Sequence, residues 1–435
     1  MIPIAQINFD GREIEAVCRV IRSGHWRMGA VAEKFERRFA HAVGARHAVA
    51  VSSGTAALFL AFKTLLRPGD EVIVPDFTFV ATASMAIAAA ARPVFADVDP
   101  RTFTLDPRDA ERRITRRTRA LAPVHLYGMP ADIRALTRLA RRHGLKIIWD
   151  AAQAHGARFG GKDVGAFPDV VCYSFYPSKN MTTGEGGMLT TSDATLAREL
   201  RLLRSHGESS RYFHERLGFN FRPTDIGSAL GIVQLGKLPA ALRARQRNAR
   251  VLARGVGSVP GIEVPEERRG RTSAYNSFTV RINPEILGVA RDELQQALGR
   301  RGIETAVHYP RPLHRQPTFR GLGRDKDFPV STRLAQTVLS LPVHSRLSRT
   351  DLERIIKADR SPSGVLPKSP AQPAQVKFFF RPNGKATGQR LQKLGAAHED
   401  AAVEFREGKA LGRAPLTADN FRPSANVIHQ TRGLA

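Results

Sequence analysis

The stretch that decides the fold is Lys146-Ile-Ile-Trp-Asp-Ala-Ala-Gln-Ala-His-Gly156, followed along the chain by Cys172-Tyr-Ser-Phe-Tyr-Pro-Ser-Lys-Asn180. The apolar run of the first stretch ends at a carboxylate, Asp150, and the second leads into a loop that carries Lys179. Each run has the length and composition of a buried strand. In open α/β sheets, ligands bind beyond the carboxyl ends of the strands. We therefore expect Asp150 and Lys179 to belong to one site.

On both sides of this pair, strand-length apolar runs alternate with helical patterns from Val31 to about Leu238. The alternation predicts an α/β fold in which a mostly parallel central sheet has helices on both faces. The expected strands are His47–Val51, Glu71–Pro75, Arg92–Asp97, Ala120–Val124, Lys146–Asp150, Val170–Phe175 and Gly187–Thr191. The expected helices include Gly11–Ser23, Thr55–Leu66, Asp132–His143 and Arg291–Arg301.

Changes of pattern divide the chain into four expected parts. Residues 1–30 form an N-terminal segment, and residues 31–238 form the large α/β domain. Residues 239–359 are expected to form a smaller α+β domain, beginning with an arginine-rich helix. Residues 360–435 are poor in large apolar residues, and we interpret them as a disordered basic extension without a catalytic motif.

The composition is that of a globular protein, with 42% hydrophobic and 25% charged residues among 435. No run approaches the roughly 18 apolar residues of a membrane span, and no signal-peptide pattern opens the chain. Cys18 and Cys172 are too few to indicate a disulfide framework or a metal site, so we expect a cytoplasmic protein.

The net charge of +27 raises the alternative of a nucleic-acid binder. The arginines, however, are spread over expected helix faces, and an aromatic content of 7% gives little sign of a base-stacking surface. A solvated basic surface is therefore the favoured interpretation, and an attraction for anionic substrates is compatible with either.

The pairing of Asp150 with Lys179 matches the needs of pyridoxal phosphate (PLP). A lysine amine bonds to the cofactor aldehyde, and a carboxylate keeps the pyridine nitrogen protonated so that the ring accepts electrons. A single lysine on a loop is more often only solvated, so the hypothesis depends on further motifs that converge on the same cofactor.

One such motif is Val51-Ser-Ser-Gly-Thr-Ala-Ala57, which follows an expected strand and opens a helix. A helix start offers free backbone N–H groups and a positive dipole end to a phosphate, and the Ser174 hydroxyl is a further candidate ligand. The alternative is that Ser53 or Thr55 only caps the helix. Both roles are compatible, because capping and anion binding use the same end.

Two further side chains suit the cofactor ring. Phe79, in Pro75-Asp-Phe-Thr-Phe79, is placed to stack on the ring, although such a phenylalanine is more often a core residue. Gln153, one turn beyond Asp150, is placed to bond the ring's phenolic oxygen. The alternatives are that Asp150 is a helix cap and that His155 makes a structural hydrogen bond.

Taken together, these motifs resemble those of the DegT/DnrJ/EryC1/StrS aminotransferases, which are fold-type I, aspartate aminotransferase-like PLP enzymes. The resemblance covers about residues 1–359. The motifs that carry it are Ser52-Ser-Gly-Thr-Ala-Ala57, Phe77-Thr-Phe79, Trp149-Asp-Ala-Ala-Gln-Ala-His-Gly156, Ser174-Phe-x-x-x-Lys179, Thr182-Thr-Gly-Glu-Gly-Gly187, Gly218-Phe-Asn-Phe-Arg-Pro-Thr-Asp-Ile226 and His308-Tyr-Pro-Arg-Pro-Leu-His-Arg-Gln-Pro317, together with Trp26. The extension after Ser361 has no counterpart in the family pattern.

The resemblance implies roles for these residues. Lys179 would hold the cofactor and carry the proton between substrate and cofactor carbons, while Asp150 would pair with the ring nitrogen. The remaining implied cofactor contacts are Gly54, Thr55, Ala56 and Ser174 at the phosphate, Gln153 at the ring oxygen, and Phe79 on the ring face. Asn220 would reach the phosphate of a neighbouring subunit, which implies a homodimer with a shared site, and Trp26, His308 and Tyr309 would lie near the sugar.

The implied reaction moves an amino group from an amino acid, glutamate, to a nucleotide-linked keto-sugar in amino-sugar or polysaccharide biosynthesis. Some relatives carry histidine in place of the lysine and dehydrate their substrate, and Lys179 argues against that branch. Three alternatives stay open: a cyclitol ketone as acceptor, a PLP-binding regulator, and a basic nucleic-acid binder that leaves the Asp150–Lys179 pair unexplained.

Overall fold

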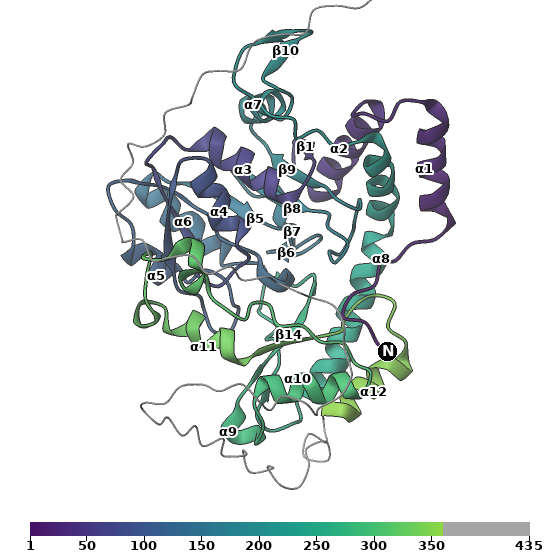
Figure 1. Ribbon diagram of the computed structural model, residues 1–435, viewed down its shortest axis with the longest axis vertical. Coiled ribbons are helices and arrows are strands. Elements are labelled where there is room, and N and C mark those ends of the chain that lie inside the picture. The colour runs from purple at the N-terminus through teal and green to yellow at the C-terminus, as the bar shows by residue number, and fades with distance from the viewer. Residues whose placement is uncertain (360–435) are drawn as a thin grey trace, which may run out of the picture. The chain divides into compact units, whose positions relative to one another are not determined.

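The computed structural model describes residues 1–359, which are built around a central seven-stranded sheet (Figure 1). Its order is β1-β9-β8-β5-β4-β2-β3. The strands are β1 (His47–Val51), β2 (Glu71–Pro75), β3 (Arg92–Ala96), β4 (Thr118–Leu121), β5 (Lys146–Asp150), β8 (Val170–Ser174) and β9 (Gly187–Thr191). Only β9 runs antiparallel to its neighbours β1 and β8. The predicted mostly parallel sheet is confirmed.

Helices cover both faces of this sheet because neighbouring residues of each strand point to opposite sides. Trp149 of β5 lies in one apolar cluster with residues of α2 and α6, whereas Ile148, its neighbour, lies in another with residues of α3, α4 and α7. The covering helices are α2 (Ala30–Val43), α3 (Gly54–Leu65), α4 (Ala81–Ala88), α6 (Ile133–His143) and α7 (Ala194–Arg204). The strands of the sheet are therefore buried on both faces, which explains their continuous apolar runs.

Most predicted elements lie within one or two residues of their observed bounds, and β4 shows the largest difference. It ends at Leu121 rather than at Val124. Pro123 has no N–H to donate, so the regular ladder stops before it. The chain nevertheless stays beside β5, because Asp150 N donates to Pro123 O at 2.9 Å.

A single helix, α8 (Asp225–Val256), links the region of the large sheet to the C-terminal part of the described chain (Figure 1). The predicted domain boundary at Leu238 falls inside this helix. Near its start α8 packs against α1 (Gly11–Ser23), and near its end against α12 (Arg349–Asp359). Asp225, in its first turn, also accepts hydrogen bonds from Gly29 N and Ala32 N at the start of α2. The domain boundaries remain predictions.

The C-terminal part contains a three-stranded antiparallel sheet with its own apolar core. Its strands are β12 (Ile262–Glu263), β14 (Phe278–Ile282) and β15 (Val338–Leu341), and its helices are α9 (Pro284–Leu287), α10 (Arg291–Arg300) and α11 (Pro329–Thr337). Several short elements complete the fold. The helix α5 (Pro107–Arg112) precedes β4, and a hairpin of β10 (Glu208–Ser210) and β11 (Phe213–His214) follows α7. The strand β6 (Arg158–Phe159) pairs with β7 (Lys162–Asp163) and β13 (Arg271–Thr272). The predicted extension 360–435 lies outside the described residues.

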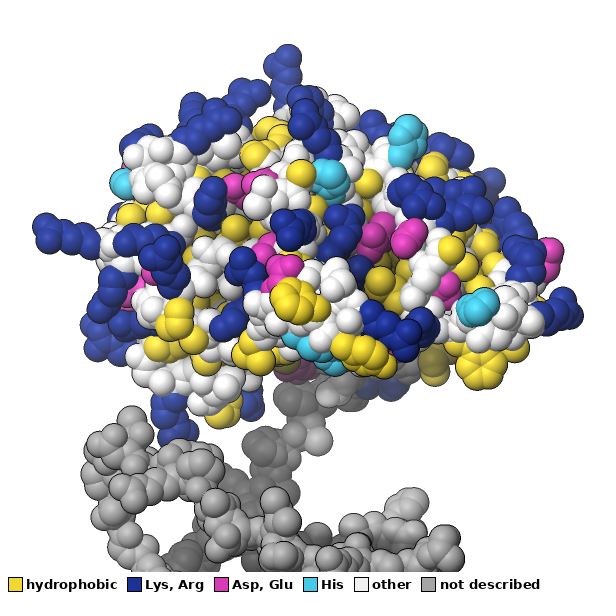
Figure 2. All heavy atoms as spheres, turned by 90° about the horizontal axis from the view of Figure 1, so that it is seen from above, with side chains coloured by type: hydrophobic (Ala, Val, Ile, Leu, Met, Phe, Trp, Pro, Cys, Tyr) yellow, Lys and Arg dark blue, Asp and Glu magenta, His cyan; other side chains and the backbone are white. Residues whose placement is uncertain are grey.

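The surface carries the strong positive charge in a scattered form. Figure 2 shows Lys and Arg side chains spread over one face, among hydrophobic and acidic side chains, without a continuous basic band. Across residues 1–359, none of the helices combines the length and the apolar composition that crossing a bilayer requires.

Candidate active site

The start of α3 forms a compact turn at the carboxyl end of β1. The Ser53 hydroxyl accepts a hydrogen bond from Ala56 N at 3.0 Å, so Ser53 is the N-cap. The N–H groups of Gly54 and Thr55, in the first turn, have no acceptor within the helix. They lie at the positive end of the helix dipole, which favours a phosphate.

Two glycines allow this turn to lie against the neighbouring strands. A Cβ on Gly54 would be only 2.6 Å from Ser174 Cβ, and one on Gly187 would be 2.3 Å from Ser53 O. Neither position therefore tolerates a side chain without displacement of the backbone. As a result the Ser174 hydroxyl lies beside the N-terminus of α3, and the predicted phosphate ligands Gly54, Thr55, Ala56 and Ser174 are adjacent.

Asp150 is a buried carboxylate at the end of β5. Its oxygens accept hydrogen bonds from Thr82 Oγ1 at 2.9 Å and from Ala152 N at 3.0 Å. Within residues 1–359, no lysine, arginine or histidine forms an ion pair with it. Burial raises its pKa, and the Lys179 charge opposes that rise. A cationic partner, such as a protonated ring nitrogen, would compensate this buried charge.

Lys179 follows β8 on a turn in which its own N–H donates to Tyr176 O at 2.9 Å. Burial lowers the pKa of its amine, and the charge of Asp150 opposes that effect. The two predicted catalytic groups therefore lie within electrostatic reach of each other. A lysine whose pKa is lowered has more of its amine in the neutral, nucleophilic form.

Gln153 is held between two tyrosines, one from each side of the site. Its Oε1 accepts a hydrogen bond from Tyr127 N at 2.6 Å, and its Nε2 donates to Tyr309 Oη at 3.3 Å. The Tyr127 hydroxyl in turn bonds to the carbonyl of His308. Gln153, His308 and Tyr309, which are far apart in the sequence, are therefore brought together.

Phe79 and Tyr309 supply aromatic rings at this place. Their ring centroids lie 6.1 Å apart, and the Phe77 ring lies 6.2 Å from that of Tyr309. Phe77 is fully buried, but Phe79 is 53% exposed. The exposure of a large aromatic ring next to a polar site favours a role on the cofactor over the core role that is common for phenylalanine.

Two predicted residues lie elsewhere on the surface of the single chain. Trp26 is 53% exposed, and its indole donates to Ile21 O. Asn220 is exposed and follows the β10–β11 hairpin in the chain. Its backbone pairs with that of Ser205 in an isolated β-bridge. The positions of both residues are compatible with contacts made across subunits.

The structure adds site residues that were not predicted. Thr82 orients Asp150, and Tyr127 orients Gln153 and His308. Asn180, next to Lys179, donates to Ala274 O at 2.9 Å and accepts from Asn276 Nδ2 at 3.3 Å. The sequence signal that could have found two of them is closeness to a predicted site residue. Thr82 lies three residues after Phe79, and Asn180 directly follows Lys179. The contacts to residues 127 and 276 depend on tertiary packing.

These groups fit PLP in kind and arrangement. The α3 turn suits a phosphate, the buried Asp150 carboxylate suits a protonated ring nitrogen, and Lys179 suits the aldehyde. The predicted contacts of Asp150, Gln153 and Phe79 with the cofactor remain predictions.

Comparison with known proteins agrees with this arrangement. The DegT/DnrJ/EryC1/StrS aminotransferase family matches residues 8–359. A curated relative named dTDP-3-amino-3,4,6-trideoxy-alpha-D-glucose transaminase, from Streptomyces venezuelae, is 42% identical over 79% of this chain and 90% of its own length. A protein from Geobacillus stearothermophilus named pleiotropic regulatory protein is 38% identical, over 78% of this chain and 91% of its own.

Among solved structures, S. venezuelae DesV in complex with a ketimine intermediate superposes with a TM-score of 0.78 at 41% identity. The match covers 80% of this chain and 94% of DesV. The predicted fold-type I architecture and the family resemblance are both confirmed. This chain belongs to the DegT/DnrJ/EryC1/StrS aminotransferase family.

Proposed function

We propose that this protein is a PLP-dependent aminotransferase that moves an amino group from glutamate to a nucleotide-linked keto-sugar in amino-sugar biosynthesis. The observation that carries the proposal is the pairing of Asp150, buried without a cationic partner, with Lys179, whose pKa is lowered, beside a phosphate-binding helix start. The identity of 42% to a dTDP-amino-sugar transaminase supports a sugar acceptor.

The residues divide the work as follows. PLP, when bound, would supply an electron-accepting ring and a carrier for nitrogen between the two half-reactions. Asp150 keeps the ring nitrogen protonated, Lys179 Nζ removes and returns the proton, and Gln153 bonds the ring oxygen. The free N–H groups of Gly54 and Thr55, with the Ser174 hydroxyl, would hold the phosphate; Ala56 N, expected there as well, donates to the Ser53 hydroxyl instead.

The complete site is proposed to need two copies of the chain. Asn220 is exposed, and within residues 1–359 its side chain makes no hydrogen bond that would explain its presence in the family motif. Apolar side chains around it are also exposed, Tyr212 by 79%, Phe213 by 61% and Leu217 by 81%. A partner subunit that receives this hairpin would cover them and place Asn220 at the partner's phosphate.

The acceptor side of the site is proposed to lie near His308 and Tyr309, with Trp26 reaching it only from a second copy of the chain. Burial and the charge of Lys179 both lower the pKa of His308, which keeps its imidazole neutral and able to hydrogen-bond a sugar hydroxyl. The proposed compartment is the cytoplasm, in keeping with the free thiols of Cys18 and Cys172.

The test is a screen of nucleotide-linked keto-sugars with glutamate, in which 2-oxoglutarate release is followed for the purified protein reconstituted with PLP. The proposal expects turnover with at least one keto-sugar and none with the same sugar lacking the keto group. If only cyclitol ketones are turned over, the acceptor is a cyclitol ketone and not a nucleotide-linked keto-sugar.

A regulator that uses PLP as a sensor is the second candidate, because the G. stearothermophilus relative is named a regulatory protein. It predicts cofactor binding without release of 2-oxoglutarate in any arm of the same screen. The screen therefore separates the two candidates.

A further inference from the structure

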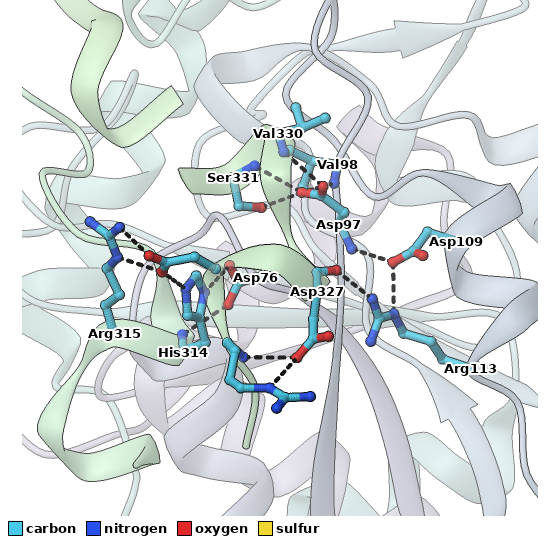
Figure 3. Close-up of polar contacts among 12 residues, drawn as sticks. Asp76, Asp97, Val98, Asp109, Arg113, His314, Arg315, Asp327, Val330 and Ser331 are labelled. Carbon is cyan, nitrogen blue, oxygen red and sulfur yellow. Dashed lines mark hydrogen bonds and ion pairs between the residues drawn. The ribbon is translucent and has the colours of Figure 1, made fainter. Parts of the chain in front are cut away.

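A second set of buried carboxylates lies at the same edge of the sheet as Asp150 but serves a different partner. Asp76 directly follows β2, and Asp97 directly follows β3. Both point at the segment of residues 308–337, here called the strap, which runs from His308 to the end of α11 (Figure 3). The strap contributes His308 and Tyr309 to the candidate site at its beginning.

Asp76 holds the strap through His314. Its backbone carbonyl accepts from Leu313 N at 2.8 Å, and its Oδ1 accepts from His314 N at 2.8 Å. Its Oδ2 lies 2.7 Å from His314 Nδ1. On the other side of the imidazole, Nε2 lies 2.9 Å from Asp325 Oδ1, and Arg315 pairs with the same carboxylate.

Burial raises the pKa of Asp76, and its contacts with His314 oppose that rise. With both carboxylates ionised, the imidazole carries both of its protons, because ionised carboxylates only accept hydrogen bonds. Burial lowers the pKa of His314, but its hydrogen bonds to Asp76 and Asp325 outweigh that effect, and the pKa is raised overall. His314 and Asp76 are both buried, so this contact is shielded from solvent. The charged groups that face the imidazole are Asp76 from the β2 loop, and Asp325 with Arg315 from the strap.

The position of this contact links it to the site. Asp76 lies three residues before Phe79, and His314 lies five residues after Tyr309. The two rings, 6.1 Å apart, therefore belong to two segments that are joined at one buried point. Displacement of His314 would change the place of Tyr309, and with it the hydrogen bond between Tyr309 Oη and Gln153.

We propose that Asp76, His314 and Asp325 form a positioning latch that fixes the rings of Phe79 and Tyr309 at the cofactor pocket. The proposal rests on the proposed function, since it assigns these rings to the PLP-binding site. His314 acts through Tyr309 and Asp76 through Phe79, so they are positioning residues and not catalytic ones.

The other attachment of the strap provides a matched control. Asp97 accepts from Val330 N at 2.9 Å, Ser331 N at 2.8 Å and Ser331 Oγ at 2.6 Å, and so holds the start of α11. Asp109 and Arg113 extend this attachment, since Arg113 bonds to Asp109 and to the carbonyl of Asp327 (Figure 3). Like Asp76, Asp97 is a buried aspartate that binds the strap, but its contacts lie at the α11 end of the strap, 21 or more residues beyond Tyr309.

The experiment compares His314→Gln with Asp97→Asn in the full-length holoenzyme. For His314→Gln we expect the dissociation constant for PLP, read from the cofactor absorbance, to rise about tenfold as aromatic contacts are lost. We expect kcat/KM to fall about 100-fold, because small displacements in an active site have effects of that size. Asp97→Asn should lower the melting temperature by about as much as His314→Gln does, but it should leave PLP affinity unchanged.

A double-mutant cycle with Asp76→Asn tests the contact itself. The effects of Asp76→Asn and His314→Gln on PLP affinity should be clearly less than additive, because either change alone breaks the latch. If His314→Gln does not fold, Asp325→Asn serves in its place, because it changes the solvent-exposed contact of the latch. It should weaken PLP affinity in the same direction but by less. Wild-type PLP affinity in folded His314→Gln, or an equal loss in Asp97→Asn, would overturn the latch.

The PLP measurement needs no sugar substrate, which separates failure of the latch from failure of the proposed function. A wild-type protein that binds PLP but aminates no keto-sugar contradicts the sugar aminotransferase proposal. The comparison of His314→Gln with Asp97→Asn would still support or overturn the latch in that protein.

Discussion

Two neighbouring parts of one sheet edge use buried aspartates in opposite ways. Asp150, at the end of β5, accepts two hydrogen bonds within the described chain and has no cationic partner there. Asp97, at the end of β3, accepts from four donor groups, of which three come from Val330 and Ser331 in the strap. The β3 aspartate is satisfied by the fold, whereas the β5 aspartate forms no ion pair within residues 1–359 and interacts with Lys179 only through its charge.

The difference teaches how a ligand site can be recognised among similar buried residues. All of these aspartates follow parallel strands, where the fold class places ligands. Between Asp97 and Asp150, the number of donors on the carboxylate, four against two, distinguishes the structural from the functional group, whereas position and burial do not. The predictions below test that distinction, beginning with the largest expected effect.

Replacement of Lys179 by alanine removes the group that moves the proton. We expect kcat for amino transfer to fall by about 10³-fold or more, as for other losses of a positioned acid–base group. The measurement is 2-oxoglutarate release, and the control is Lys146→Ala, which replaces the exposed first residue of β5. Full activity in Lys179→Ala would remove this residue from the mechanism.

Replacement of Asp150 by asparagine keeps the shape but not the charge. We expect kcat to fall about 100-fold, because a neutral side chain no longer holds the proton on the ring nitrogen. The melting temperature of the cofactor-free protein should stay the same or rise, since a buried charge without a cationic partner is lost. A large loss of stability together with full activity would show that Asp150 is structural.

Replacement of Asp97 by asparagine should lower stability and leave kcat unchanged, the reverse of the effects expected for Asp150→Asn. Its amide group cannot accept all four hydrogen bonds, so we expect the free energy of unfolding to fall by about 1–3 kcal/mol. The kcat of the folded variant should remain near that of the wild type. Urea unfolding followed by circular dichroism gives the first quantity, and a strong loss of kcat at unchanged stability would reverse the assignment.

The smallest effect concerns pH. Burial raises the pKa of Asp150, so the folded cofactor-free protein binds this proton more tightly than the unfolded chain does. Its contribution to stability is therefore greatest at low pH and is lost as pH rises from about 4, the ordinary aspartate value, through the raised pKa. Asp150→Asn should flatten this part of the dependence of the free energy of unfolding on pH.

The sequence was sufficient to predict the fold class and the strands that carry Asp150 and Lys179. Their apolar runs are long and uniform because both faces of the sheet are covered, which is a strong local signal. The predicted end of β4 at Val124 was wrong, because Pro123 ends the regular ladder and the strand stops at Leu121. The helix α8 runs without a break across the expected domain boundary at Leu238.

The site was predicted less completely, because its support comes from tertiary contacts. Thr82, Tyr127 and His314 reach their partners across 68, 26 and 238 positions of the chain, and no local pattern announces such pairs. Asp76 was not singled out in the sequence, and its carboxylate is engaged by the strap.

The central claim is that Asp150 and Lys179 operate PLP for amino transfer, and a single half-reaction tests it most directly. Purified protein loaded with PLP is mixed with glutamate alone, and both the cofactor absorbance and 2-oxoglutarate are measured. The account predicts loss of the visible cofactor band with about one 2-oxoglutarate released per site, and no such change in Lys179→Ala. An unchanged band and no 2-oxoglutarate from the wild-type protein, tested with several amino acids, would contradict the claim.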